Sequence, residues 1–126
     1  MLAALPHGAS PADLVRAWSR ALNANDNKAA GALFAPGARV VQPGVDVRLT
    51  SRGLRVAFNA SLPCAGRIVA IHVHGNRAVA TFVLGTRPKH RCDGPGQRAA
   101  ALFVVRAGKI VLWQQVPVPA DDQPTA

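Results

Sequence analysis

Two histidines on one predicted strand are the residues best placed for acid–base or metal chemistry. His72 and His74 are two positions apart in a segment whose apolar residues alternate, so both imidazoles point to one face. Such a pair can act as a general base near neutral pH, and with a third ligand it can hold zinc. His90 or Asp93 would be that ligand only if the fold brought it there. The alternative is a polar strand face beside a turn or subunit contact, and we predict neither a bound metal nor a cofactor.

Asp46 is the other candidate base. It alternates with Arg48 on a short predicted strand, so the carboxylate and the guanidinium share a face. A carboxylate in this setting can accept a proton from water or substrate. The structural alternative is an exposed ion pair between Asp46 and Arg48 near a turn. The catalytic candidates are therefore Asp46, His72 and His74.

The two cysteines lie in Pro/Gly-rich segments. Cys64 is in LPCAG and Cys92 in CDGPG, and a bond between them would close a loop of 28 residue steps (92 − 64). Such a loop closure contributes about 3–4 kcal/mol in the chain-entropy model. Two free thiols, a Cys/His metal site and a reactive Cys92 beside His90 are the alternatives.

The first ten residues, MLAALPHGAS, lack the length and early positive charge of a secretion signal. We therefore expect a cytoplasmic protein. A disulfide between the two cysteines would instead favour an oxidising compartment and export.

Length and charge limit the function further. The 126 residues suit a single domain over residues 1–126, and no apolar run reaches the roughly 18 residues that span a bilayer. Fifteen Lys and Arg residues against six acids give a net charge of +9, which suits anionic partners. Aromatic residues make up only 5% of the chain and none is Tyr, so a base-stacking platform has few candidates. We expect neither a nucleic-acid nor a membrane partner.

The first third of the chain carries helix signals. Ser10 is a good N-cap, Pro11 suits the first helical position, and Asp13 can complete a capping box. Asn25-Asp26-Asn27 favours the end of this helix and the cap of a second one. Pro36-Gly37 then predicts the end of the second helix and the start of a strand.

The remainder is predicted to be mostly strands, with one helix. Turn pairs at Pro43-Gly44, Gly75-Asn76 and Ala107-Gly108 separate alternating segments, which favours hairpins. This is an α+β layout in which helices pack on the concave side of a curved antiparallel sheet. Residues 117–126 are predicted to form a flexible polar tail. The expected strands are Ala38 to Gln42, Val45 to Leu49, Arg67 to His74, Arg77 to Thr86, Gln97 to Arg106 and Lys109 to Val116, with the helix over Arg52 to Leu62.

The segment Asp13 to Gln42, DLVRAWSRALNANDNKAAGALFAPGARVVQ, resembles the opening of the nuclear transport factor 2-like superfamily. That superfamily includes the SnoaL-like cyclases and the ketosteroid isomerases, and GKIVLWQQ near the C-terminus resembles its common ending. The resemblance implies a cone-shaped α+β domain whose three helices and curved sheet enclose one deep apolar pocket. It also implies a homodimer built through the open sheet face. The pairing of LPCAG with CDGPG resembles SnoaL-like proteins of actinobacteria, which implies a Cys64–Cys92 disulfide.

The catalytic groups of the ketosteroid isomerases are absent from the matching positions. Trp18 stands where those enzymes have a Tyr, Gln42-Pro43 where they have Asp-Pro, and Ala99 to Phe103 holds no acid. Gln cannot accept a proton as a base, and an indole N–H only donates. The Asp-Arg-Asp arrangement of the related limonene-epoxide hydrolases has only Asp46, Arg48 and Asp93 to match it.

The resemblance therefore predicts a pocket that lacks the catalytic residues of the ketosteroid isomerases. The leading hypothesis is a noncatalytic site for a small apolar or polycyclic molecule. The first alternative is an isomerase, cyclase or hydrolase that acts on a polycyclic or epoxide substrate with Asp46 or His72/His74 as base. The second is a protein-interaction module whose pocket its own side chains fill. We expect the pocket to be lined by Trp18, Gln42, Phe58, Trp113 and Gln115.

Overall fold

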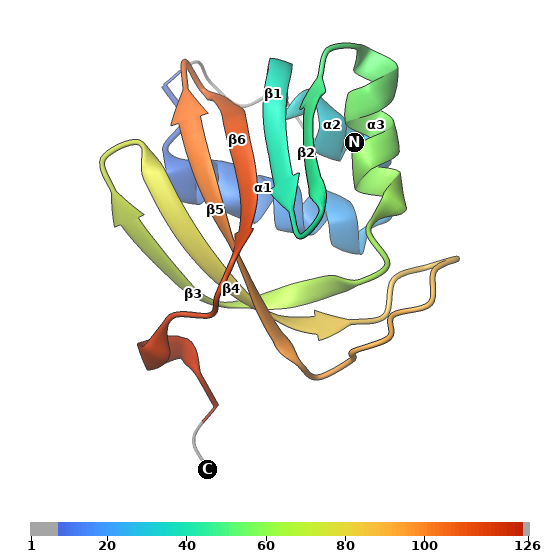
Figure 1. Ribbon diagram of the computed structural model, residues 1–126, viewed down its shortest axis with the longest axis vertical. Helices are drawn as coiled ribbons and strands as arrows, with labels where there is room; N and C mark the ends of the chain where they lie inside the picture. Colours follow the sequence, from blue (N-terminus) through green and yellow to red (C-terminus); the bar gives the residue numbers. More distant parts are fainter. Residues whose placement is uncertain (1–7, 125–126) are drawn as a thin grey trace.

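The computed structural model describes residues 8–124, so the predicted absence of a secretion signal rests partly on residues 1–7, outside the described part. Three helices lie behind one curved sheet of six strands (Figure 1). The elements are α1 (Pro11–Asn23), α2 (Asn27–Ala32), β1 (Phe34–Gln42), β2 (Val45–Leu49), α3 (Arg52–Ser61), β3 (Ala65–His74), β4 (Arg77–Gly85), β5 (Arg98–Arg106), β6 (Lys109–Val116) and the 3-10 helix η1 (Ala120–Asp122).

Short-range hydrogen bonds fix the first two helices as their sequence predicts. The Ser10 hydroxyl accepts from the Asp13 N–H at 3.2 Å, and the Asp13 carboxylate accepts from the Ser10 N–H at 3.2 Å. This reciprocal capping box satisfies two N–H groups that a helix start leaves without partners. Asp26 caps α2 in the same manner by accepting from the Ala29 N–H at 3.0 Å. The helix starts are therefore set within a few residues of sequence.

The strands form an open sheet in the order β2-β1-β6-β5-β4-β3. All neighbouring strands are antiparallel except β1 and β6, which run parallel. The α+β cone is confirmed, but the sheet is mixed and not wholly antiparallel. The reason is topological, because β1 precedes the whole β3–β6 meander and receives β6 against its free edge.

The prediction that Pro36-Gly37 ends the second helix is wrong. That helix ends at Ala32, and Pro36 and Gly37 both lie inside β1. Gly37 has φ +76°, a backbone conformation open mainly to glycine, and the β1–β6 register shifts between Phe34 and Arg39. The dipeptide therefore makes an irregularity in a strand, where a proline removes one ladder donor.

The two faces of the sheet differ in what covers them. The face toward the helices carries the aromatic and aliphatic core, including Val40, Phe103 and Ile110, which are fully buried. We call this the helix-facing side and the opposite surface the open face. Because side chains alternate along a strand, His72 lies on the open face next to Ile71, which packs against the core.

Residues 117–124 dock onto the open face, unlike the flexible tail predicted for residues 117–126. Asp122 is only 6% exposed. Its carboxylate accepts from the Thr81 hydroxyl at 2.8 Å and lies 2.9 Å from Nε2 of His72. Its main-chain oxygen accepts from Arg98 at 2.6 Å. Residues from three strands thus hold Asp122, whereas the polar composition of the segment predicts a flexible tail. Residues 125–126 lie outside the described part.

Candidate functional site

A cavity of about 250 Å³ lies between α1 and the helix-facing side of the sheet. Four of the five predicted lining residues border it, namely Trp18, Gln42, Trp113 and Gln115. Phe58 does not. Its ring packs 5.2 Å from that of Trp113, so it supports the wall from behind. The other bordering residues are Ser19, Leu22, Leu62, Pro63, Cys64, Ala65, Gly66, Phe82, Leu84, Ala99, Ala100 and Ala101.

The two tryptophans of the cavity wall differ in hydrogen bonding. Nε1 of Trp18 donates to Oδ1 of Asn59 at 2.8 Å, and Asn59 is fully buried. Nε1 of Trp113 is buried and has no acceptor among the described residues. A buried donor without a partner costs roughly 1–3 kcal/mol. The Trp18 N–H is therefore used within the fold, whereas the Trp113 N–H is unpaired and enclosed by protein atoms although its residue borders the cavity.

Polar groups are few and neutral around the cavity. Gln42 is half-buried and Gln115 is exposed, so their amides lie where the cavity meets solvent. Trp, Phe, Leu and Ala side chains form most of the remainder. No Asp, Glu, His, Lys or Arg borders the cavity within the described chain. The site can bind and orient a molecule through hydrogen bonds, but its lining supplies no general acid or base.

A run of small residues makes room for the cavity, and we did not predict it as part of the site. Ala99, Ala100 and Ala101 border the cavity where the acid of the ketosteroid isomerases would lie. Gly66 closes another part of the wall, where an added Cβ would lie 2.7 Å from the Val83 oxygen. The alanine run was the available signal, since Ala99 and Ala101 alternate onto the helix-facing side and their methyl groups leave space there, while the Ala100 side chain points to the open face.

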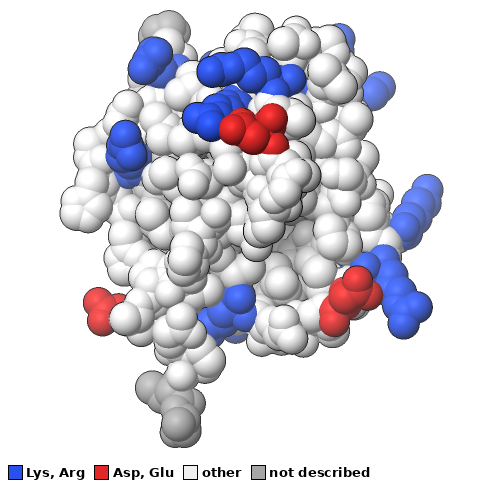
Figure 2. All heavy atoms as spheres, in the orientation of Figure 1, with Lys and Arg blue, Asp and Glu red and all other residues white. Residues whose placement is uncertain are grey.

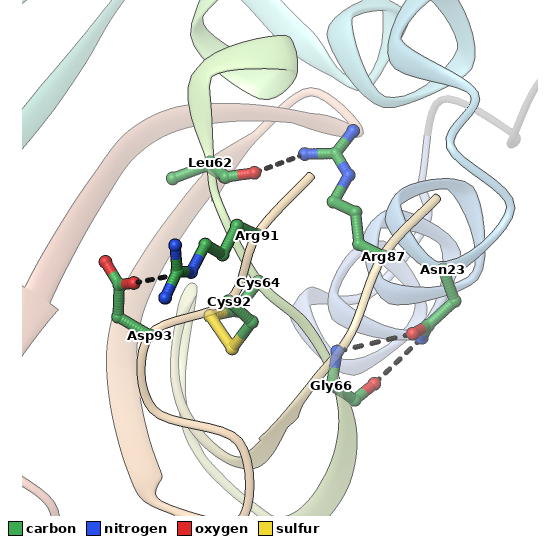
Figure 3. The surroundings of a disulfide bond; sticks show 8 residues. All are labelled: Asn23, Leu62, Cys64, Gly66, Arg87, Arg91, Cys92 and Asp93. Carbon is green, nitrogen blue, oxygen red and sulfur yellow. Dashed lines mark hydrogen bonds and ion pairs between the residues drawn. A yellow bond between two sulfur atoms is a disulfide. The ribbon is translucent and has the colours of Figure 1, made fainter. Parts of the chain in front are cut away.

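A disulfide joins Cys64 and Cys92 (Figure 3). Cys64 borders the cavity just before β3, and Cys92 lies in the β4–β5 loop. The bond therefore ties one wall of the cavity to a loop 28 residues later. The two-thiol and Cys/His metal alternatives do not describe this structure. The relation to an actinobacterial branch stays a prediction.

Arg87 adds a second, noncovalent tie beside the disulfide (Figure 3). Its guanidinium is 2% exposed and donates to the main-chain oxygens of Asn59 and Leu62 at 2.7 and 2.8 Å. It also donates to the side-chain oxygens of Asn25 and Asn27. Burial lowers the pKa of Arg87. This cation is satisfied by neutral oxygens, and it joins the α1–α2 turn to the end of α3.

The predicted catalytic residue Asp46 does not border the cavity. It pairs with Arg39 at 2.6 Å on the outer two strands, and both side chains are about half exposed. The hydrogen bond from Arg39 holds the pKa of Asp46 below its ordinary value. The expected partner Arg48 instead donates to the Gly37 oxygen at 3.3 Å. Asp46 thus forms an exposed ion pair as predicted, but its partner is Arg39 and not Arg48. The pairing of β1 with β2 brings Arg39 beside Asp46.

His72 and His74 share a strand but not a site. Nε2 of His72 lies 2.9 Å from the Asp122 carboxylate, and His74 is exposed near the end of β3. The hydrogen bond from His72, helped by Thr81, lowers the pKa of Asp122. Neither histidine borders the cavity. Within residues 8–124 there is no group of three or more His, Cys, Asp or Glu residues able to hold a metal ion.

Comparison with known proteins agrees with this architecture. A model of the SnoaL-like domain matches residues 15–113. The chain belongs to the SnoaL-like domain family. No curated protein sequence matches significantly. In the part of the chain that the structure describes, no helix has the length and apolar character to cross a membrane.

Solved structures share the fold of this SnoaL-like domain at low sequence identity. A nuclear transport factor 2-like protein of unknown function from Cytophaga hutchinsonii superposes with TM-score 0.69 at 15% identity, covering 92% of this chain and 93% of its own. A protein from Catenulispora acidiphila with a ketosteroid isomerase-like fold, in complex with trimethylamine, gives 0.69 at 21%, covering 92% and 100%. A protein from Sinorhizobium meliloti, provisionally named a polyketide cyclase, gives 0.67 at 22%, covering 82% and 94%. These likenesses establish the fold alone.

Proposed function

We propose that this SnoaL-like domain binds a small, neutral, largely apolar molecule in the cavity and performs no chemistry on it. The observation that carries the proposal is the lining, in which no titratable side chain among residues 8–124 borders the cavity. Apolar walls with a few placed polar groups are typical of small-molecule sites. An anionic or cationic ligand would be desolvated there without a counter-charge, which is costly.

A hydrogen-bond acceptor on the ligand could reach the unpaired Trp113 N–H only if the surrounding side chains shift on binding, because this atom is enclosed by protein. A carbonyl or ether oxygen placed beside Nε1 would satisfy a donor that the protein leaves without a partner. The Gln42 and Gln115 amides at the entrance can donate or accept, so they tolerate a second polar group. A molecule with one buried oxygen and an apolar ring system matches this arrangement.

Cavity size favours the smaller of the predicted ligands. A volume of about 250 Å³ lies below the roughly 300–1,000 Å³ of sites for drug-sized ligands. One or two fused rings suit this space better than a four-ring skeleton. The ligand class is therefore a compact cyclic ketone, lactone or ether.

Three matched probes test this proposal by titration calorimetry, namely the bicyclic ketone tetralone, its hydrocarbon tetralin and the charged naphthoate. We expect tetralone to bind about five- to tenfold more tightly than tetralin, as one net hydrogen bond implies, and naphthoate to bind least. Trp113→Phe should remove the preference for tetralone while changing tetralin affinity little. Tetralin is the control, because a change in the shape of the cavity wall would alter its affinity as well as that of tetralone.

A cavity-filling change locates the binding. Ala101→Leu places three more carbons into the bordered space and should abolish tetralone binding, whereas Val79→Leu on the open face should not. Equal affinity for tetralone and naphthoate, or tetralone binding that survives Ala101→Leu, would contradict the proposal.

The two alternative functions have less support in this geometry. Asp46, His72 and His74 lie outside the cavity, so a base for a substrate held there is lacking among its bordering residues. The interaction-module hypothesis requires Phe58 and Trp113 to close the pocket, whereas Phe58 stands behind Trp113 and the cavity remains open. Turnover of 1,2-dihydronaphthalene oxide, an epoxide of similar size, that Asp46→Asn abolishes would favour the enzyme.

We also propose a homodimer through the open face. Charged side chains lie mainly at the margins of this face and leave its centre uncharged (Figure 2). Half-exposed Leu102 and Leu112 both lie on this face, with Leu102 opposite Gln114 and Leu112 opposite Val104 on neighbouring strands. Sedimentation equilibrium should give a dimer for the native chain and a monomer for Leu112→Glu, with Leu54→Glu on α3 as control. A monomeric native chain at micromolar concentration would contradict this assembly.

A further inference from the structure

We propose that the open groove between α1 and β3 binds an acidic, partly apolar segment of another protein. The groove encloses about 990 Å³. Arg16 and Arg20 line it from α1, and Arg67 lines it from β3. All three side chains belong to exposed residues. This surface is separate from the ligand cavity and its proposed function.

No acid neutralises these three guanidiniums within residues 8–124. None of them takes part in an ion pair there, and no Asp borders the groove. The aspartates are engaged or placed elsewhere: Asp13 with Ser10, Asp26 with Ala29, Asp46 with Arg39, Asp93 with Arg91, Asp122 with His72, and Asp121 in η1. The positive excess of the chain is thus locally uncompensated at the groove.

The spacing of the arginines suits more than one carboxylate. Arg16 and Arg20 are four residues apart on a helix, which makes them neighbours on its surface and mutually repulsive. Arg67 faces the same groove from the strand. An acidic partner would relieve this repulsion and gain bidentate guanidinium–carboxylate contacts. A single carboxylate cannot reach all of this surface, whereas a segment with several can.

The residues on the floor of the groove indicate which class of anion it suits. Ile68, Ala70 and Leu84 give it an apolar part, and in the described part of the chain no aromatic residue borders it for base stacking. The groove is wide, so a small anion bound in it would remain mostly in solvent. A typical small-molecule site instead buries most of the surface of its ligand. Carboxylates interspersed with aliphatic side chains match both features. A second copy of this chain is a poor occupant of this groove, because its six aspartates are spread along the chain and most of them are already engaged.

The groove also shares a wall with the ligand cavity. Ser19, Gly66 and Leu84 border both spaces. The Asn23 amide reinforces this wall by donating to the Gly66 oxygen at 2.8 Å and accepting from its N–H at 3.3 Å (Figure 3). A partner segment seated in the groove would therefore lie directly behind the cavity wall.

Fluorescence anisotropy with the full chain and a labelled peptide rich in glutamate and leucine tests the proposal. The Arg16→Gln/Arg20→Gln double variant should bind this peptide about tenfold more weakly, and Arg67→Gln about threefold. Arg77→Gln/Arg106→Gln is the matched control, since it removes the same charge from exposed positions outside the groove. We expect this control to stay within about twofold of the native affinity.

Several outcomes would overturn the proposal. Equal losses in the two double variants would mean attraction by net charge alone. A control peptide of glutamine and leucine that binds as tightly would mean that the groove does not recognise carboxylates. A glutamate peptide that does not bind at millimolar concentration would also overturn the proposal. Oligo(dT) that displaces the peptide, and that loses affinity in the Arg16→Gln/Arg20→Gln variant, would assign the groove to nucleic acid.

Discussion

The helix-facing side of the sheet holds a cavity walled by indole, amide and methyl groups, whereas the open face holds the buried carboxylate of Asp122 with His72 and Thr81. The first region has space without titratable groups. The second has titratable groups packed against one another, and neither Asp122 nor His72 borders the cavity. Catalysis requires both in one place, so their separation favours binding as the role of the cavity and docking of the C-terminal segment as the role of the polar cluster.

Loss of the disulfide should have the largest effect, and it acts on the cavity side alone. Cys64→Ser/Cys92→Ser should lower the free energy of unfolding by about 3–4 kcal/mol, because the open chain regains loop entropy. Tetralone affinity should fall as well, since Cys64 borders the cavity. Urea unfolding and calorimetry measure the two effects.

The open face provides the control for this variant. The imidazole resonances of His72 should stay unchanged in its NMR spectrum, because the Asp122 contact lies on the other side of the sheet. A change in the His72 resonances as large as the change in resonances of cavity residues would contradict the separation of the two faces. Mass spectrometry of protein isolated from its native cells, two hydrogens lighter if the bond is present, would also test the expected cytoplasmic compartment.

Protonation of Asp122 should release the C-terminal segment with an intermediate effect. The folded-state pKa of Asp122 lies below its ordinary value of about 3.8, chiefly through the hydrogen bond from His72, with help from Thr81 and Arg98. The unfolded chain therefore binds the proton more readily than the folded one does. The stabilisation is complete above the ordinary pKa and is lost as pH falls through the lowered folded pKa.

Hydrogen exchange of residues 117–124 measures this release. In the native chain, protection should persist at pH 5 and fall at strongly acidic pH, whereas Asp122→Asn should lose protection at both. Asp121→Asn changes the neighbouring exposed aspartate and should behave like the native chain. Tetralone affinity at neutral pH should be the same in all three proteins, and a parallel loss in Asp122→Asn would mean that the two faces are coupled.

Substitution of the exposed candidates should have the smallest effect. Asp46→Asn and His74→Gln each change an exposed residue outside the cavity. Tetralone affinity should remain within about twofold of the native value, as is usual for exposed charges distant from a site. A larger loss by calorimetry would bring the enzyme hypothesis back, because it would connect a titratable group to the cavity.

Most of the local structure was predictable because it depends on near neighbours. Ser10, Asp13 and Asp26 cap helices through contacts within three residues, and the Gly75-Asn76 pair falls between β3 and β4 as predicted. The resemblance to SnoaL-like proteins then placed Trp18, Gln42, Trp113 and Gln115 around one space. Phe58 was misplaced, because its helical phase does not reveal which of two stacked rings borders the cavity.

What the sequence determined by itself is most of the helices and strands, the helix N-caps, the hairpin turns, the resemblance to the family and the absence of the isomerase residues from the matching positions. The tertiary structure alone decided the parallel pairing of β1 with β6, the choice of Arg39 over Arg48 by Asp46, and the docking of Asp122 onto His72, 50 residues away. Helix caps and turns are fixed by hydrogen bonds within a few residues. Partner choice across the sheet depends on strand order, register and twist, which arise only when distant segments pack together.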